Sequence, residues 1–166
     1  FVFIMKTLYL VRHAKSDWEN GSLLDIERPL NERGYSNANS MSKTFLTKYD
    51  NPDVIITSPA IRAITTALIF ARNINYDANT IQIKQNLYET NKNEYLNVVT
   101  SMSDDYQSIM LFAHNPTISD FTDMLCKSLP FELSTCAIAG IKFDINSWKD
   151  LNSKTGELFL FDRPKK

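Results

Sequence analysis

The chain contains two histidines, and each follows directly after an apolar run that is typical of a buried β-strand. His13 follows the run at 8–12, and His114 follows the run at 109–113. Open α/β sheets bind ligands at the carboxyl ends of their strands, so both imidazoles are expected at one such edge. A neutral imidazole is a nucleophile or a proton carrier near pH 7. The pair therefore indicates chemistry at this edge.

Cationic residues accompany these histidines. Arg12 directly precedes His13, and Lys15 follows closely. Arg62 falls in the first turn of a predicted helix, where the helix dipole disfavours a cation. It is either a solvated surface arginine or a guanidinium aimed at an anion beside the helix. Two arginines and two histidines together suit a dianionic phosphoryl group, because guanidinium donors match phosphate oxygens.

Other phosphate and metal sites are excluded by spacing. The four glycines stand at 21, 34, 140 and 156, so the chain has neither a Walker loop nor a GxGxxG turn, and it has no GxSxG elbow. A zinc site would need both histidines with Cys126 and Cys136. That spacing matches no zinc finger, and the neighbouring arginines would repel the cation.

Composition predicts an ordinary globular protein. The 166 residues are 43% apolar and 22% charged, which fits a single domain over 1–166. The net charge is −1 and the cations are scattered, so neither a nucleic acid nor a membrane is expected as a partner. Two cysteines without close pairing suggest a reduced, cytoplasmic protein. Residues 1–4, which precede Met5, are expected to be an upstream extension.

Strand-like and helical segments alternate along the chain. The predicted helices cover 31–49, a segment opened by Ser58-Pro59, 91–103, and a segment from Asn115-Pro116 to about 127. Asn31, Ser58 and Asn115 are the expected N-caps. A long polar loop spans 13–30. The predicted strands cover 6–12, 53–57, 80–84, 107–113, 133–145 and 157–162.

This alternation predicts an α/β fold, a three-layer α/β/α sandwich around a mostly parallel central sheet. The last two strands are expected to pair as an antiparallel edge. The core face of the helix after Ser58 is expected to consist of Ile61, Ile64, Leu68 and Ala71.

The segment LVRHAKSDW at 10–18 resembles the Arg-His-Gly or Arg-His-Ala signature of the histidine phosphatase superfamily, which includes the cofactor-dependent phosphoglycerate mutases. Further blocks resemble the small SixA-type phosphohistidine phosphatase branch. They run in the family's order: RPLNERG at 28–34, DVIITSPAIRAITTA at 53–67, LYE at 87–89 and AHNP at 113–116. Ala113 and Thr57 stand where many members have Gly and Ser. The resemblance implies a phosphoglycerate mutase-like fold.

The resemblance also implies a mechanism in which His13 attacks phosphorus and forms a phosphohistidine that water hydrolyses. Arg12, Arg62 and His114 would bind the phosphoryl oxygens, with Lys15 at the periphery. The reaction needs no metal and no other cofactor. Glu89 is the candidate general acid, because a carboxyl group beside phosphate should have a raised pKa. The alternatives to it are Glu94, Glu19 and Asp17.

The leading hypothesis is a phosphatase acting on phosphohistidine in a protein. A small phosphorylated ester is the close alternative as substrate, and a non-catalytic phosphate-binding module is a third hypothesis. The short chain leaves little sequence for a lid, which favours a macromolecular substrate over an enclosed small one. A binding module would have no need of a nucleophile such as His13.

Overall fold

A six-stranded sheet with the strand order β3-β2-β4-β1-β5-β6 runs through the computed structural model, which describes residues 5–127 and 132–166. The four strands from β3 to β1 are mutually parallel. β5 runs antiparallel to β1, and β6 antiparallel to β5. The strands are β1 (Lys6–Arg12), β2 (Val54–Thr57), β3 (Gln82–Ile83), β4 (Ser108–Ala113), β5 (Ile138–Phe143) and β6 (Glu157–Asp162).

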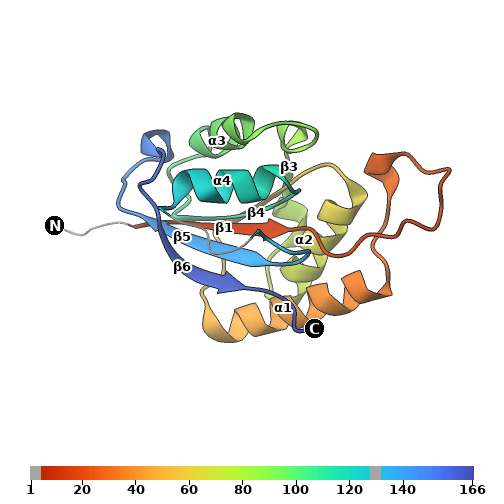
Figure 1. The fold of residues 1–166 in the computed structure, drawn as a ribbon. Coiled ribbons are helices and arrows are strands. Elements are labelled where there is room, and N and C mark those ends of the chain that lie inside the picture. Colours follow the sequence, from red (N-terminus) through yellow and green to blue (C-terminus); the bar gives the residue numbers. More distant parts are fainter. Residues whose placement is uncertain (1–4, 128–131) are drawn as a thin grey trace.

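Helices cover both faces of this sheet (Figure 1), with α3 and α4 on one side and α1 and α2 on the other. The predicted three-layer α/β fold with an antiparallel edge is confirmed. The helices are α1 (Glu32–Lys48), α2 (Ile61–Asn73), α3 (Lys92–Thr100) and α4 (Thr117–Leu125). No helix within the described ranges is long and apolar enough to cross a membrane. The extension expected at 1–4 lies outside those ranges.

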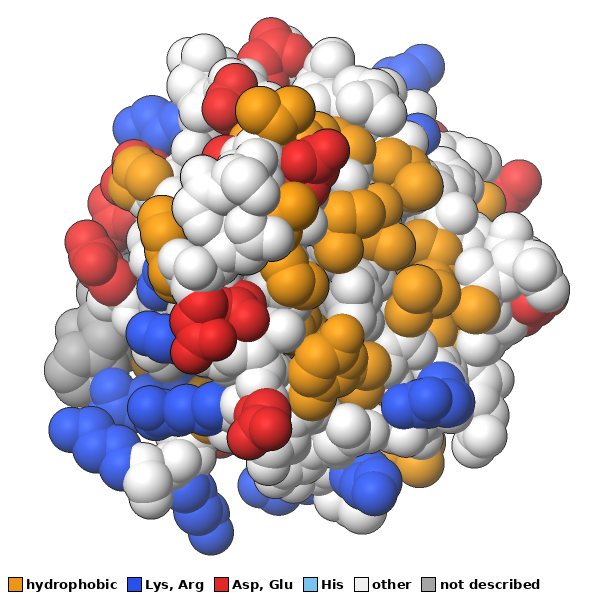
Figure 2. Space-filling model, turned by 90° about the vertical axis from the view of Figure 1, so that its right-hand side faces the viewer, with side chains coloured by type: hydrophobic (Ala, Val, Ile, Leu, Met, Phe, Trp, Pro, Cys, Tyr) orange, Lys and Arg blue, Asp and Glu red, His pale blue; other side chains and the backbone are white. Residues whose placement is uncertain are grey.

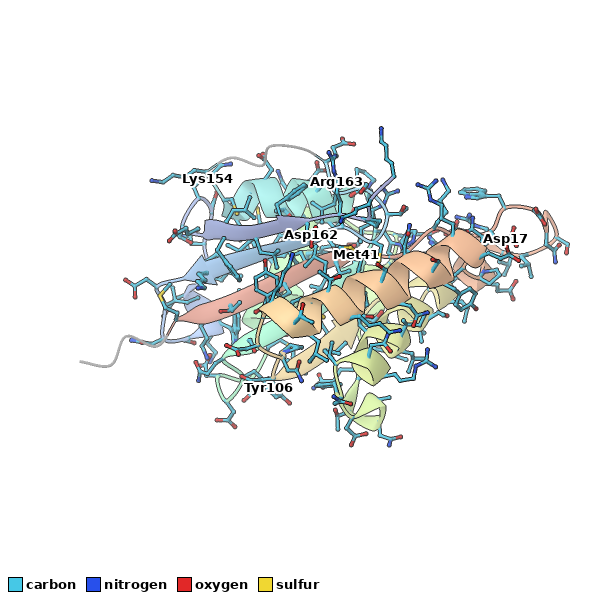
Figure 3. All side chains as sticks on the ribbon, turned by 90° about the horizontal axis from the view of Figure 1, so that it is seen from below. Asp17, Met41, Tyr106, Lys154, Asp162 and Arg163 are labelled. Atoms are coloured by element: carbon cyan, nitrogen blue, oxygen red, sulfur yellow. The ribbon has the colours of Figure 1, made fainter. Side chains whose placement is uncertain are left out.

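Side chains of β1 alternate between the two halves of the core. Leu8 and Leu10 pack on the side of α3 and α4, whereas Tyr9 and Val11 pack on the side of α1 and α2. Met41 of α1, labelled in Figure 3, is buried in the second half. A strand buried on both faces appears in sequence as an unbroken apolar run, and this explains the runs that end at the two histidines.

The loop at 13–30 is ordered by a few specific contacts. It contains a 3₁₀ turn at Asp25–Glu27 and an isolated bridge between Ser16 and Leu30. Its far end leads into α1, whose cap is the predicted Asn31, with the side chain accepting from the Gly34 amide over 2.8 Å.

The predicted core face of α2 is wrong at two of its four positions. Ile61 and Leu68 are 43% and 44% exposed, Ile64 is half-buried, and only Ala71 is fully buried. The helix is rotated because its buried side carries the Arg62 guanidinium as well as small and aromatic side chains. That buried side consists of Arg62, Ala63, Thr66, Ala67, Ile69, Phe70 and Ala71.

Two predicted N-caps are also wrong. α2 begins at Ile61 after Ala60, and α4 begins at Thr117 after Pro116, in each case without a side-chain cap. Ser58 and Asn115 instead make tertiary hydrogen bonds. Ser58 Oγ contacts His114, and Asn115 donates to the Leu133 carbonyl over 2.9 Å.

Candidate active site

The pairing of β1 with β4 brings the two histidines together. Arg12 lies opposite Ala113 in this parallel register, so the next residue of each strand leaves the sheet at the same edge. The ring centroids of His13 and His114 are 5.1 Å apart. The predicted convergence of both imidazoles at one edge is therefore seen in the structure.

His13 is held in one tautomer. Its Nδ1–H donates to the Ala14 carbonyl over 2.7 Å, and its Nε2 accepts from Arg62 Nε over 3.4 Å. A carbonyl can only accept, so the proton resides on Nδ1 and the lone pair on Nε2. The pKa of His13 is lowered to about 4, chiefly by burial. The guanidinium charges of Arg62, Arg12 and Arg28 also lower it, whereas the hydrogen bond to the Ala14 carbonyl raises it. The ring is thus neutral at pH 7, with its lone pair on Nε2.

His114 is likewise neutral. Burial, reinforced by the charges of His13 and Arg62, lowers its pKa to about 3. Its Nε2 lies 2.6 Å from Ser58 Oγ, while its Nδ1 is buried without a hydrogen-bond partner. Arg12 Nε is the other such atom among the described side chains, and both residues line the same pocket. A buried N–H normally has an acceptor, so Arg12 Nε–H, and His114 Nδ1 in the tautomer that protonates it, suit an anionic ligand rich in acceptor oxygens.

Arg62 and Arg12 reach the pocket from different elements. Arg62 lies in the first turn of α2 and is 6% exposed, so the alternative of a solvated surface arginine is wrong. Arg12 Nη1 donates to the Leu133 carbonyl over 3.0 Å. Burial lowers the pKa of Arg12 from its ordinary value, against a raising contribution from Glu132.

Asp25 is the residue of the pocket that sequence reasoning missed most completely. Arg62 donates to its backbone carbonyl over 2.7 Å and to its Oδ2 over 3.0 Å. Arg28 donates to Oδ1 from both Nε, over 3.2 Å, and Nη2, over 2.7 Å, and the Tyr88 hydroxyl donates to Oδ2 over 2.6 Å. Partial desolvation raises the pKa of Asp25, but these hydrogen bonds outweigh it and hold the pKa well below its usual range. Asp25 is therefore ionised.

Arg28 was also missed as a pocket residue. Its guanidinium stacks 3.3 Å from the centre of the Trp18 ring and donates to Ser16 Oγ over 3.3 Å. The sequence contained a weak indication of this role. Asp25 and Arg28 have the i, i+3 spacing of an ion pair, and Arg28 is the first residue of the block at 28–34. Nothing in the local sequence indicates that this loop folds back onto α2.

Lys15 and Glu89 occupy more peripheral positions. Lys15 is exposed and lines the pocket. Glu89 is exposed, has a positive φ of 49°, and is not among the residues that line the pocket. Burial raises the pKa of the Tyr88 hydroxyl, to which the charge of Glu89 also contributes, and the Tyr88 ring packs against His114 at a centroid distance of 5.6 Å. Asp17, Glu19 and Glu94 do not line the pocket either.

These side chains surround a hollow of about 440 Å³ at the carboxyl ends of the parallel strands. Figure 2 looks onto this end of the molecule and shows apolar side chains across its centre and right, with lysines and arginines gathered at the lower left. The hollow contains three guanidinium groups, one carboxylate and two neutral imidazoles. The lining residues are Arg12, His13, Lys15, Ser16, Trp18, Asp25, Arg28, Arg62, His114, Asn115 and Thr135.

The chain is similar to several known proteins over most of its length. It is 27% identical to an uncharacterized chloroplastic protein of Arabidopsis thaliana, with 92% of this chain and 73% of the relative covered. A crystal structure from Agrobacterium tumefaciens, described as a candidate phosphohistidine phosphatase SixA, has a TM-score of 0.81 at 25% identity, with 96% of this chain and 99% of that chain covered.

Two further structures share the fold at lower identity. The protein histidine phosphatase SixA complexed with tungstate has a TM-score of 0.80 at 18% identity, over 95% of this chain and 96% of that one. A mycobacterial glucosyl-3-phosphoglycerate phosphatase has a TM-score of 0.71 at 14% identity, over 96% and 100% of the two chains. The fold therefore occurs in phosphatases named for a protein substrate and for a small-molecule one.

The model of the histidine phosphatase superfamily (branch 1) matches residues 8–123, which include both histidines and all three arginines of the pocket. This match covers more than half of the chain and agrees with the fold. The chain belongs to the histidine phosphatase superfamily, branch 1.

Proposed function

We propose that this protein is a phosphohistidine phosphatase that carries the phosphoryl group on His13. The observation that carries the proposal is the state of this imidazole. It is neutral, its Nδ1–H is bound to the Ala14 carbonyl, and its Nε2 lone pair lies beside the Arg62 guanidinium. A neutral nitrogen lone pair next to a phosphate-binding cation is what attack on phosphorus requires, and the long 3.4 Å contact with Arg62 Nε would be exchanged for one to the phosphoryl group.

The proposed reaction has two displacements. In the first, His13 Nε2 forms a bond to phosphorus while the P–N bond of the substrate breaks, and the electron pair of that bond stays on the leaving imidazole. In the second, water attacks phosphorus, the His13 P–N bond breaks, and inorganic phosphate leaves. Arg12, Arg28 and Arg62 would neutralise the phosphoryl charge in both steps, so the proposed reaction uses no metal. His114 would add a hydrogen bond, and its pKa would rise beside the dianion.

Asp25 favours a phosphoramidate substrate over an ester. It is the one carboxylate among the described lining residues, and four donors hold it ionised, so it has no proton to donate to a leaving alkoxide. An imidazole leaves as a neutral ring once its distal nitrogen carries a proton, so it depends less on a positioned acid. Glu89, at the Tyr88 hydroxyl, is the proposed proton donor where one is needed.

Buried thiols support a cytoplasmic setting for this activity. Cys126 and Cys136 are both free and almost fully buried, which suits a reducing compartment. The proposed partner is a phosphorylated protein, and a small phosphate ester is the second candidate substrate. The second candidate is kept because the chain shares its fold with a glucosyl-3-phosphoglycerate phosphatase.

The test compares a phosphohistidine peptide with an alkyl phosphate and an aryl phosphate, using the wild-type protein, His13→Ala and Glu89→Gln. We expect kcat/KM to be highest for the phosphohistidine peptide and to fall by at least about 1,000-fold in His13→Ala. Glu89→Gln should slow the alkyl phosphate more than the peptide, because only the alkoxide needs a strong proton donor. Higher kcat/KM for the alkyl phosphate in the wild type would favour the ester function. Unchanged turnover in His13→Ala would refute the nucleophile.

A further inference from the structure

A second hollow, of about 460 Å³, adjoins the candidate active site and is lined by cations. Its lining includes Arg33, Arg163, Lys165 and Lys166. Among the described residues that line it, none is acidic. We call the hollow that these four residues line the cationic hollow. Thr135 lines both this hollow and the pocket around His13, so the two are contiguous.

The topology explains why these cations gather at the site. β6 runs parallel to β1, because each is antiparallel to β5, so its carboxyl end lies at the same sheet edge as His13. Arg163 follows β6 directly, and Figure 3 shows it close to Asp162, the last residue of that strand. Arg33 lies in the first turn of α1, which that loop leads into. Residues distant in sequence thus form one surface beside the pocket.

Three of these four cations, Arg33, Lys165 and Lys166, are in no ion pair with the described residues. Ion pairs of the described side chains instead join Arg28 and Arg62 to Asp25, and Lys154 to Asp123. Arg33, Lys165 and Lys166 are all exposed. Since the whole chain has a net charge of −1, this cationic surface is a local concentration. It would attract an anionic partner and raise its association rate.

A neighbouring hollow differs in charge. It meets the pocket through Lys15, Ser16 and Trp18 and shares Arg33 with the cationic hollow, but its lining also includes Asp17, Glu19 and Glu32. An acidic segment is therefore favoured over the cationic hollow and disfavoured over this mixed one. The difference in charge would give a bound polypeptide a preferred direction out of the pocket.

We propose that the cationic hollow binds acidic residues on one side of the phosphorylated histidine in a protein substrate. The inference rests on the proposed function, because it assumes that a phosphohistidine of a polypeptide enters the adjoining pocket. The inference specifies the chemistry of the protein substrate, whose glutamate or aspartate carboxylates would pair with Arg33, Lys165 and Lys166.

The experiment uses phosphohistidine peptides that differ only in flanking residues, with two Glu before the phosphohistidine, two Glu after it, or Gln at all four positions. Arg33→Gln/Lys165→Gln removes two charges of the hollow. The control is Lys43→Gln/Lys48→Gln, which removes two exposed charges from later turns of the same helix. The value of kcat/KM is measured at low ionic strength and in about 0.5 M salt.

We expect one of the two Glu peptides to be preferred over the Gln peptide by roughly 3- to 10-fold at low ionic strength, with the preference lost in high salt. The preference should disappear in Arg33→Gln/Lys165→Gln and persist in the control. All variants should turn over an aryl phosphate at the wild-type rate. Equal kcat/KM for all three peptides, or equal loss of preference in both variants, would overturn the docking proposal while leaving the phosphatase proposal intact.

A separate measurement distinguishes docking from catalysis. Binding of the same peptides, fluorescently labelled, to His13→Ala is followed by anisotropy. Tighter binding of one Glu peptide would support docking even if the wild-type protein failed to hydrolyse any substrate, which would refute the proposed function alone. Binding to anionic phospholipid vesicles or DNA, with no discrimination among peptides, would assign the hollow to another class of partner and overturn the proposal.

Discussion

At the scale of single residues, the candidate site depends on hydrogen bonds that restrict each functional group to one state. The Ala14 carbonyl determines the tautomer of His13, and Asp25 holds the far side of the Arg62 guanidinium. Arg62 is therefore fixed beside His13 before a phosphoryl group binds. Preorganised donors of this kind lower the barrier because little reorganisation accompanies the reaction.

Asp25→Asn tests this positioning. The amide keeps the size of the side chain but loses the charge that pairs with both Arg28 and Arg62. We expect kcat/KM to fall by roughly 10- to 100-fold for the phosphohistidine peptide and the aryl phosphate alike, because misplacement of a phosphate-binding arginine affects every substrate. Steady-state kinetics measure the change, and Asp25→Glu should recover part of it.

The control for this prediction is Asp17→Asn in the same loop. Asp17 Oδ1 accepts only the nearby Glu19 amide in the described contacts, and Asp17 does not line the pocket. Asp17→Asn should retain nearly wild-type kcat/KM. An Asp25→Asn variant as active as Asp17→Asn would show that Asp25 does not position Arg62.

At the scale of elements, the close approach of α1 to the loop at 13–30 determines where the pocket residues lie. A Cβ atom on Gly34 would lie 2.2 Å from the Lys15 carbonyl oxygen and 3.2 Å from Leu30 Cβ. The first contact is with backbone and cannot be relieved by a side-chain rotation. The loop and the helix can approach this closely only because residue 34 is glycine.

Gly34→Ala should therefore shift the loop and destabilise the fold by about 1–3 kcal/mol, as overpacking does elsewhere. Urea unfolding measures the loss, and phosphatase assays should show reduced kcat/KM because Lys15, Ser16 and Arg28 move with the loop. Gly21→Ala is the matched control, since a Cβ there meets nothing within 4 Å. Equal stability of the two variants would contradict the proposed constraint.

The sequence predicted the elements better than their orientation. Apolar runs located β1 and β4, and the local Asx signal located the cap at Asn31, because these features depend on neighbouring residues. Periodicity shows that Ile61 and Leu68 share a face of α2, but it does not show which face the core covers. Arg62 is buried beside the pocket, and Ile61 and Leu68 therefore lie on the side of α2 that faces solvent.

The other incorrect sequence predictions also failed because tertiary contacts determine the roles of the residues. Ser58 and Asn115 have the residue types of N-caps, yet their side chains bind His114 and the Leu133 carbonyl. Asp25 lies in a polar loop whose sequence resembles any solvated segment. Its role depends on contacts with Arg62 and Tyr88, which lie 37 and 63 positions away. Local pattern cannot predict such contacts.

At the scale of the whole molecule, two buried neutral histidines link stability to pH. Burial and cationic neighbours lower the pKa of His13 to about 4 and of His114 to about 3, below the ordinary value of 6.5. The unfolded chain therefore binds protons that the folded chain does not. Their stabilising contribution is complete above pH 6.5 and is lost as the pH falls from 6.5 toward 4 for His13 and toward 3 for His114.

We expect the free energy of unfolding to decrease by up to about 1.4 kcal/mol per pH unit for each histidine in this range. Urea unfolding between about pH 7 and pH 5.5 measures the slope, and His114→Gln should roughly halve it. Added inorganic phosphate should shift the histidine titration upward, because a bound anion favours the protonated rings. A slope unchanged by His114→Gln would contradict the assignment.

The phosphoryl group on His13 is the most direct test of the whole account. The protein is mixed with a phosphohistidine peptide, quenched in alkali within milliseconds, digested, and examined by mass spectrometry under conditions that preserve P–N bonds. We predict a phosphoryl group on the peptide that contains His13, labile to acid and absent in His13→Ala. Turnover of the same substrate without a phosphoryl group on His13 at any quench time, or with the label on His114, would contradict it.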